Sequence, residues 1–287
     1  MYLKNDKIVV KVGSVTMTSS KLGLPAELIL DPSAVSGWTD GVQVRRDGTI
    51  RLGRHGDFME PSTLSARLIE FSGTAIATSM AELQGLRDRL VGVLREGVYE
   101  SLSVETMTDR RYVTVGLEGR PSWIRQTDTT AVFKIAFYAP DPFIYGETNT
   151  IQAGATTTES DGGLKYALSY PLNYSSTNTI TTNGTVTNRG NAEAWPRFVV
   201  SGDYFSGFTI TNNRDKRVTY TGAVYMAAPV EIDMARGTAI QGGIDRTILL
   251  KDRDFFSVAP GEVMKPKFTP LAAGSGWCDI IIRDTWI

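Results

Sequence analysis

The chain of 287 residues carries 30 basic and 31 acidic side chains, so its net charge of −1 provides no electrostatic attraction to nucleic acid or to an anionic membrane. Cys278 is the only cysteine and His55 the only histidine, which excludes disulfide frameworks and Cys/His zinc clusters. The length is sufficient for two domains of about 100 to 200 residues each. No apolar run approaches the ~18 residues of a membrane span, and folding in a reducing cytoplasm is expected.

The N-terminal half is predicted to consist mainly of strands. The β-branched residues of 8–15 favour a first strand, and a hairpin is predicted over 41–54. At the centre of that hairpin is Asp47-Gly48, a dipeptide that tolerates the positive φ angles of a tight turn. Apolar residues alternate on both sides of it, namely Val42, Val44, Ile50 and Leu52.

The alternation continues in the next segment of the chain. Leu64, Ala66 and Leu68 recur with a period of two, which predicts a strand with these residues on one side. The charges of Arg67 and Glu70 then indicate a side that faces solvent or a partner.

One helix is predicted in this half, over 79–96. Ser79 suits its N-cap, and Glu82 follows three residues later, which is the spacing of a capping box. Gly97 is placed to end the helix. The apolar residues at helical spacing are Leu83, Leu86, Leu90, Val93 and Leu94.

Two glycines inside this helix each cost about 1 kcal/mol relative to alanine. Gly85 and Gly92 are seven residues apart and therefore share one face. Either that face packs closely on the neighbouring sheet, or the glycines are simply tolerated.

A domain boundary is predicted where the last strand of this half is stopped. Three apolar side chains share one face of that strand: Phe133, Ile135 and Phe137. Pro140 and Pro142, on either side of Asp141, lack the N–H group that a central ladder needs, so the backbone must leave its sheet here. Residues 1–146 are therefore expected to form an α+β domain, in which one helix lies on a sheet of meandering antiparallel strands.

The composition changes after this boundary. From 147 to 183 Thr, Ser, Asn and Gly dominate, so part of the segment is expected to be loop. Leu164, Tyr166 and Leu168 alternate inside it, which favours a strand or an extended arm.

The rest of the second domain, 147–287, is predicted to be a β-sandwich. Short strands recur from 185 onward, and turn dipeptides such as Asn212-Asn213 and Pro260-Gly261 separate them. The expected strands lie at 198–200, 208–210, 218–220, 230–232, 248–250, 255–258 and 280–282.

Several positions in this half suit defined backbone geometries. Asn188 and Gly190 suit a tight turn, Pro196 suits the start or edge of a strand, and Pro260-Gly261 suits a hairpin. Such residues report packing and not chemistry. These five positions, with Trp195 and Gly202, belong to the runs of sequence that carry a family resemblance, and we call the seven the fold-signature residues: Asn188, Gly190, Trp195, Pro196, Gly202, Pro260 and Gly261.

Five runs of sequence contain these residues or follow them in order. They are GTVTNRGNAEAWPRFVVSG (184–202), FTITNN (208–213), APVEIDMARGTAIQGG (228–243), FFSVAPGE (255–262) and IIIRDTWI (280–287). In order and spacing this half resembles the C-terminal domain of the distal tail proteins of long, non-contractile-tailed bacteriophages. The first half is similar through its hairpin, its helix and a strand that ends in Ala-Pro-Asp-Pro.

This resemblance implies a mainly β protein whose C-terminal domain is a galectin-like jelly roll. It also implies a non-enzymatic virion protein at the distal end of the tail, assembled in the host cytoplasm, without cofactors. Its copies would form a hexameric ring between the tail tube protein and the tail hub or receptor-binding apparatus. The ring would leave a channel for the tape measure protein and for DNA, which passes without specific binding; no membrane contact is implied.

The sequence adds a weaker reason for placing ring contacts in the N-terminal domain. Its long alternating strands have exposed edges and one helix to cover them, so a neighbour's strand or loop is expected to cover the rest. Head-to-tail contacts of this kind close into a ring if the rotation permits. The C-terminal domain is then expected at the periphery.

Candidate catalytic groups are better explained by structure. His55, Asp57 and Ser62 could supply a nucleophilic triad, but their setting indicates an exposed hairpin end. Asp252 and Asp254 could be a carboxylate pair, yet a charged turn before a strand is the simpler interpretation.

Neither a nucleophile nor a metal site is predicted elsewhere. Cys278 precedes an apolar last strand, where cysteine behaves as a small buried hydrophobe. No catalytic, cofactor-binding or metal-ligating residue is therefore assigned. The alternative function is a carbohydrate-binding module that recognises the host surface through exposed tryptophans or tyrosines of the C-terminal domain.

Overall fold

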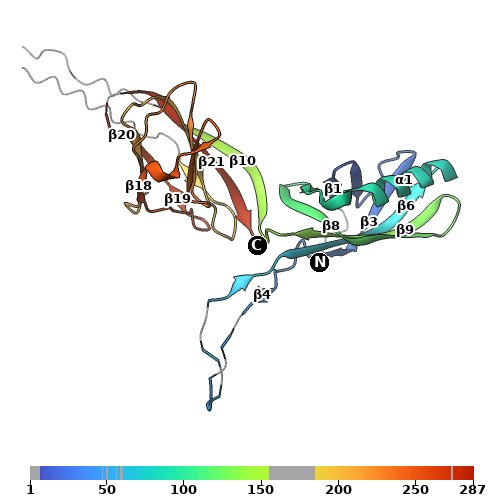
Figure 1. Ribbon diagram of the computed structural model, residues 1–287. Helices are drawn as coiled ribbons and strands as arrows, with labels where there is room; N and C mark the ends of the chain where they lie inside the picture. Colours follow the sequence, from blue (N-terminus) through green and yellow to red (C-terminus); the bar gives the residue numbers. More distant parts are fainter. Residues whose placement is uncertain are drawn as a thin grey trace, which may run out of the picture. The chain divides into compact units, whose positions relative to one another are not determined.

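The computed structural model describes residues 7–46, 48–49, 51–55, 57–58, 61–154, 185–272 and 274–287. The chain divides into two compact units, one of residues 1–147 with Ile287 and one of residues 148–286. The described residues are mainly β, with a single α-helix in the first unit (Figure 1). None of the helices in these residues is long and apolar enough to cross a membrane.

Seven strands of the first unit close into a β-barrel. Their order is β8-β7-β1-β2-β3-β6-β9, and β9 pairs again with β8 to complete the circle. Neighbouring strands are antiparallel except β2 and β3, which run parallel. Closure removes the exposed sheet edges that an open meander would leave, so the prediction of an open sheet is wrong. The strands are β1 (Val9–Val12), β2 (Val15–Thr18), β3 (Ala26–Ser36), β6 (Arg67–Ala77), β7 (Glu100–Glu105), β8 (Arg110–Arg125) and β9 (Thr130–Ala139).

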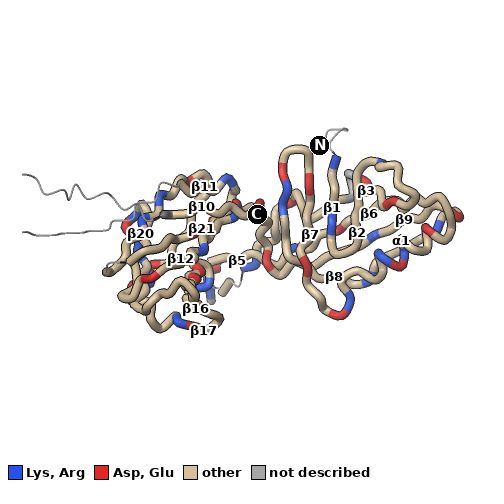
Figure 2. Tube along the Cα trace, turned by 90° about the horizontal axis from the view of Figure 1, so that it is seen from above, with Lys and Arg blue, Asp and Glu red and all other residues tan. Residues whose placement is uncertain are grey.

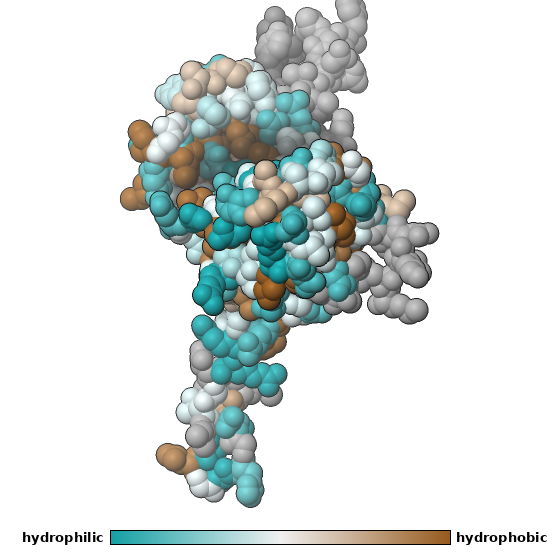
Figure 3. Space-filling view, turned by 90° about the vertical axis from the view of Figure 1, so that its right-hand side faces the viewer, coloured by the Kyte–Doolittle hydropathy of each residue, from teal (hydrophilic) through white to brown (hydrophobic). Residues whose placement is uncertain are grey.

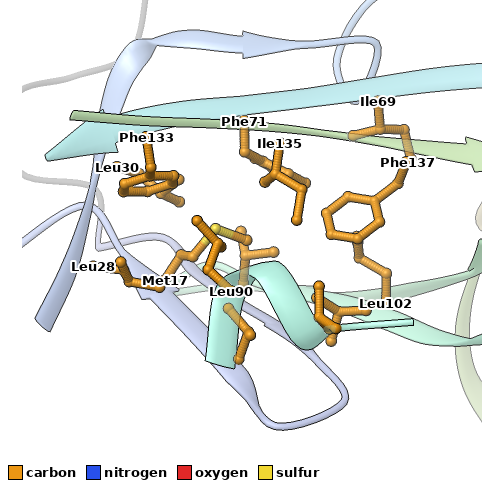
Figure 4. Close-up of a cluster of buried hydrophobic side chains, with 14 of the residues drawn as sticks. Met17, Leu28, Leu30, Ile69, Phe71, Leu90, Leu102, Phe133, Ile135 and Phe137 are labelled. Carbon is orange, nitrogen blue, oxygen red and sulfur yellow. The ribbon is translucent and has the colours of Figure 1, made fainter. Parts of the chain in front are cut away.

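The barrel closes around the apolar face that β9 presents. Its burial alternates residue by residue, and Phe133, Ile135 and Phe137 all point inward, as predicted (Figure 4). Phe137 packs edge-to-face on Phe71 of β6, with ring centroids 6.1 Å apart. Burying one such side chain contributes about 1.5–3 kcal/mol, so this face stabilises the barrel together with the other residues of the buried cluster.

The helix α1 (Met80–Gly92) begins as its capping box predicts. The Ser79 hydroxyl accepts a hydrogen bond from the Glu82 amide at 3.3 Å, and the Glu82 carboxylate accepts one from the Ser79 amide at 3.2 Å. The side chains of α1 buried in the barrel core are Leu83, Leu86 and Leu90. Figure 4 shows Leu90 among the side chains of the strands.

The helix ends earlier than Gly97, so the predicted C-terminus is wrong. Val93 returns to extended backbone, and Leu94 takes a left-handed conformation before the short 3-10 turn η1 (Arg95–Gly97). A Cβ atom added at Gly85 or Gly92 would meet nothing within 4 Å. Close packing of a glycine face is therefore wrong, and both glycines are tolerated.

Two predictions for the N-terminal half are wrong, one in the number of strands and one in strand register. Residues 8–15 form not one strand but the hairpin of β1 and β2, which turns at Gly13 with a φ of +52°. In β6 the inward residues are Arg67, Ile69 and Phe71, while Leu68 is 47% exposed. Because side chains alternate along a strand, this one-residue slip reverses both sides of the strand.

The hairpin predicted over 41–54 is longer and turns later. The strand β4 (Val44–Arg45) pairs with β5 (Thr63–Leu64), and the Arg54 amide bonds to the Arg51 carbonyl at 3.3 Å. The turn is therefore at 51–54, where Gly53 has a φ of +72°. Asp47 and Ile50 are outside the described residues. We call residues 41–65 the arm.

The second unit contains two larger antiparallel sheets. Their orders are β17-β16-β15-β12-β21-β10 and β18-β14-β13-β20, and β11 pairs with β19. Both sheets contribute to one buried cluster, in which the Phe268 ring lies 5.4 Å from Tyr204 and 5.3 Å from Phe208. The elements are β10 (Ile144–Gly154), β11 (Val186–Thr187), β12 (Arg197–Asp203), β13 (Phe208–Thr211), β14 (Arg217–Tyr220), β15 (Val230–Asp233), β16 (Thr238–Gln241), β17 (Ile244–Asp245), the 3-10 turn η2 (Thr247–Leu249), β18 (Leu250–Arg253), β19 (Val263–Met264), β20 (Lys267–Pro270) and β21 (Ser275–Trp286).

The strands predicted for this half are observed with two exceptions. The strand predicted at 248–250 begins only at Leu250, and 255–258 contains a single bridge, from Val258 to Ala194. Residues 148–154 continue β10 and are not loop, whereas the alternation of Leu164, Tyr166 and Leu168 is outside the described residues.

Candidate assembly interface

The groups of the conceivable triad lie on the arm and do not form a catalytic arrangement. His55, Asp57 and Ser62 are exposed, and in the described part of the chain no hydrogen bond joins them. A triad requires the base within hydrogen-bond reach of the nucleophile and oriented by the acid. In the described residues these three side chains therefore do not form a triad.

The acidic residues near β18 have structural partners. The Asp252 carboxylate accepts a hydrogen bond from the Thr219 hydroxyl at 2.7 Å and lies 3.5 Å from Nε of Arg217. Asp254 is exposed, and the described residues contain no group of three His, Cys, Asp or Glu side chains that could hold a metal ion. Cys278 is buried, and this burial raises the pKa of its thiol, which disfavours the thiolate.

The most unusual feature of the first unit is the arm. It projects from the barrel as a two-stranded ribbon (Figures 1 and 3). Leu52 is 97% exposed and Phe58 is 57% exposed, and every described side chain from 43 to 63 is exposed. A ribbon of two strands without a core is at best marginally stable in water, so an arm of this kind is suited to burial against another surface.

The arm carries both apolar and basic groups. The guanidinium carbon of Arg51 lies 5.3 Å from the centre of the Phe58 ring, which is a cation–π distance. Four arginines and three acidic residues between 41 and 65 leave the arm close to neutral. Charges of both signs are also interspersed over the barrel, including along α1 (Figure 2). The arm is therefore suited to a mixed protein surface rather than to a polyanion.

Arg67 is bonded to residues 37–40, which lead from β3 into the arm and which we call the arm root. Its charge had predicted a solvated position. Its side chain is buried, and burial lowers the pKa of the guanidinium, while nearby Asp40 acts in the opposite direction. The Nε atom donates to the Pro142 carbonyl at 2.9 Å, and Nη1 donates to the carbonyls of Gly37 at 2.7 Å and Asp40 at 3.1 Å. The period shared with Ile69 and Phe71 is the sequence signal that could have placed Arg67 inside.

In the second unit, Asn188 is the centre of a buried network. Its amide nitrogen donates to the carbonyls of Ala192 at 2.7 Å and Val258 at 3.0 Å. Its side-chain oxygen accepts from the amides of Gly190 at 2.9 Å and Thr285 at 3.4 Å. The network joins three segments, which gives Asn188 a packing role.

The remaining fold-signature residues have varied environments. A Cβ atom at Gly190 would lie 1.8 Å from the Thr285 carbonyl oxygen, and one at Gly202 would lie 2.2 Å from that of Ser275. Pro260-Gly261 forms a turn closed by the Glu262 amide on the Ala259 carbonyl at 3.0 Å. Pro196 is buried before β12, but Trp195 is 44% exposed and is not part of the core.

An exposed aromatic pair lies on the surface of the second unit. Phe205 and Tyr225 are 65% and 49% exposed, and their rings meet edge-to-face with centroids 5.9 Å apart. Met226 beside them is 50% exposed. Exposed apolar groups that gather in this way are typical of surfaces that bind a partner or a ligand.

Comparison with known proteins finds similar folds only among solved structures. Neither known protein families nor curated sequences match the chain. Among solved structures, the SPP1 Dit (gp 19.1) protein, described as a paradigm of the hub adsorption apparatus in phages that infect Gram-positive bacteria, is similar with a TM-score of 0.61 and 13% identity. The match covers 90% of this chain and 94% of that one. A chain of the phage P2 baseplate in its activated conformation with Ca aligns over 97% of both chains, at a TM-score of 0.47 and 11% identity. The chain therefore has the fold of the SPP1 Dit protein along most of its length.

Proposed function

We propose that this chain is a non-enzymatic structural protein of a phage tail tip. Its copies form a hexameric ring at the distal end of the tail, which joins the tail tube to the hub or receptor-binding apparatus. The ring leaves a channel for the tape measure protein and for DNA. The second unit is a galectin-like jelly roll at the periphery, and the virion is assembled in the host cytoplasm. No cofactor is required.

The observation that carries this proposal is the arm on a barrel of this fold. The barrel is closed by its own strands, so its edges do not call for a neighbour, whereas the arm exposes Leu52 and Phe58. Covering the arm with the next copy in a head-to-tail arrangement generates a ring when the rotation closes. The number six comes from the resemblance to distal tail proteins. Near-neutral charge is compatible with a conduit, because a basic lumen would retain DNA.

The test is the mass of the assembled particle. Light scattering of the full chain alone is expected to give six times the 31.4 kDa chain mass. If ring closure needs tail tube and hub proteins, their complex is expected to contain six copies of this chain after the partners' mass is subtracted. Leu52→Asp is expected to reduce the particle to monomers, because it places a charge in the covered surface. Ile248→Asp is the matched control, since Ile248 is also largely exposed but lies in η2 of the second unit. Equal effects of the two variants would contradict a role of the arm in assembly.

The aromatic pair supports a second candidate, the recognition of host-surface carbohydrate by the second unit. Aromatic side chains provide flat apolar faces that suit sugar rings. Retention of the chain on cell-wall polysaccharide, lost when Phe205 and Tyr225 are both changed to Ala, would favour this function. Retention that persists in the double variant would reject the pair as the site.

A further inference from the structure

Arg67 links parts of the first unit that are distant in the sequence. Gly37 and Asp40 belong to the turn through which β3 leads into the arm, and Arg67 opens β6 where the chain returns from it. Pro142 belongs to the turn between β9 and β10. One guanidinium group therefore bonds the arm root on one side and this boundary turn on the other.

The chemistry of this contact is unusual for a barrel wall. Arg67 is 3% exposed, its three hydrogen bonds all go to backbone carbonyls, and its Nη2 atom has no partner in the described part of the chain. A charge without a paired carboxylate is costly to bury, and an apolar residue would fill the same wall at lower cost. An apolar residue, however, lacks the planar guanidinium group, whose forked N–H donors reach carbonyls on two sides at once.

Both turns that Arg67 joins are held tightly. A Cβ atom at Gly37 would lie 1.8 Å from the Leu68 carbonyl oxygen, so the arm root lies directly against β6. The Asp40 carboxylate accepts from the Gly37 amide at 2.8 Å. In the boundary turn, the Asp141 carboxylate accepts from the Phe143 amide at 3.1 Å and from the Tyr145 hydroxyl at 2.6 Å.

We propose that Arg67 is a latch that couples the arm root to the boundary turn at 140–143. A change in the boundary turn withdraws the Pro142 carbonyl from the guanidinium and loosens the arm root, and a change at the arm root acts on the boundary turn equally. This coupling goes beyond the proposed ring function and does not depend on it, because all the groups belong to one chain.

Hydrogen exchange of the full chain tests the latch. The reporters are the amide of Ser65, bonded to the Gln43 carbonyl at 2.9 Å at the base of the arm, and the amide of Phe143 in the boundary turn. The Ala77 amide, bonded to the Thr129 carbonyl at 2.9 Å, serves as the reference in the barrel. Arg67→Lys keeps the charge but loses the fork, so exchange at Ser65 and Phe143 is expected to rise about tenfold with Ala77 unchanged.

A second variant tests the coupling without touching the guanidinium. Asp141→Ala releases only the boundary turn, and it is expected to speed exchange at Ser65 about tenfold in the Arg67 background but to add nothing in the Arg67→Lys background. Asp128→Ala is the matched control, because Asp128 pairs with Arg125 in the turn between β8 and β9. All variants are compared in the same oligomeric state, verified by light scattering. Faster exchange at Phe143 with unchanged Ser65 in Asp141→Ala would overturn the latch, even if Arg67→Lys fails to fold.

Discussion

At the level of single residues, buried polar side chains with several hydrogen bonds are expected to matter more for stability than exposed charges do. Asn188 is completely buried, and both its side-chain nitrogen and its side-chain oxygen have two backbone partners. Removing the amide would take one hydrogen bond from each of these backbone groups, although the Val258 carbonyl would still accept from the Ala194 amide. Each buried group that is left without any partner costs about 1–3 kcal/mol.

Asn188→Ala is therefore expected to lower the free energy of unfolding by about 3 kcal/mol. Asn213→Ala is the control, since Asn213 also bonds backbone groups, Val263 and Lys265, but at an exposed site. The control is expected to cost under about 1 kcal/mol, because water can replace its bonds. Urea unfolding of both variants makes the comparison, and equal losses would show that Asn188 has no special role.

Glu27 gives a prediction about pH. Burial by itself raises the pKa of this carboxyl, but hydrogen bonds from the amides of Leu24, Leu22 and Gly23, with nearby Lys21, outweigh burial and lower the pKa. A carboxyl with a lowered folded-state pKa contributes stability above its unfolded pKa and loses it as the pH falls through the folded value.

Glu27→Gln is accordingly expected to reduce stability at neutral pH and to flatten the acid limb of the stability profile. The matched control is Glu231→Gln, because Glu231 pairs with Arg197 at an exposed position. Thermal unfolding from pH 7 to pH 3 measures both effects. A variant whose acid limb stays as steep as that of the parent chain would contradict this role of Glu27.

Residue patterns predicted some of these sites and missed others for physical reasons. Asn188, Gly190 and Pro260-Gly261 could be found because they satisfy local backbone geometry, which is encoded within a few residues. The burial of Arg67 depends on carbonyls at Gly37 and Pro142, which are remote in sequence. The charge of Arg67 predicted an exposed position. Arg67 also follows the two-residue period of the inward-facing Ile69 and Phe71, but that signal is weaker.

In the helices and strands, glycine is required at some positions and only tolerated at others. A Cβ atom at Gly85 of α1 would enter open space, whereas one at Gly73 of β6 would lie 2.0 Å from the Ile29 carbonyl oxygen. Gly85→Ala is expected to stabilise the chain by about 0.5–1 kcal/mol, because alanine loses less conformational entropy in a helix. Gly73→Ala is expected to destabilise it clearly. Thermal unfolding decides, and a destabilised Gly85→Ala variant would show a packing role that the structure lacks.

Strong local signals made α1 and β9 predictable, but the arm and the barrel closure were not. The capping box and the alternation of β9 act within single elements. Closure of the barrel depends on β8 pairing with β9 and on the parallel contact of β2 with β3, which no local pattern encodes. In the arm, the sequence allows a turn at Asp47-Gly48 as well as the turn observed at 51–54. Exposed side chains provide no buried face that would fix the register of the two strands.

At the scale of the whole molecule, each unit has its own buried core. One cluster is confined to residues of the first unit and the other to residues of the second. Residues 148–287, expressed alone, are therefore expected to unfold in one cooperative transition, and 1–147 are expected to retain ring formation. Calorimetry and light scattering of the two pieces check this. If 148–287 assembled while 1–147 stayed monomeric even with tail tube and hub proteins, the assigned roles would be reversed.

The central claim is that the first unit and its arm build a closed six-fold ring. Electron microscopy of the purified full chain, with tail tube and hub proteins present, tests it most directly. We expect class averages with six copies around an open channel, each arm lying on the neighbouring copy. Open filaments, rings closed through the second unit, or particles in which the arms remain free would contradict it.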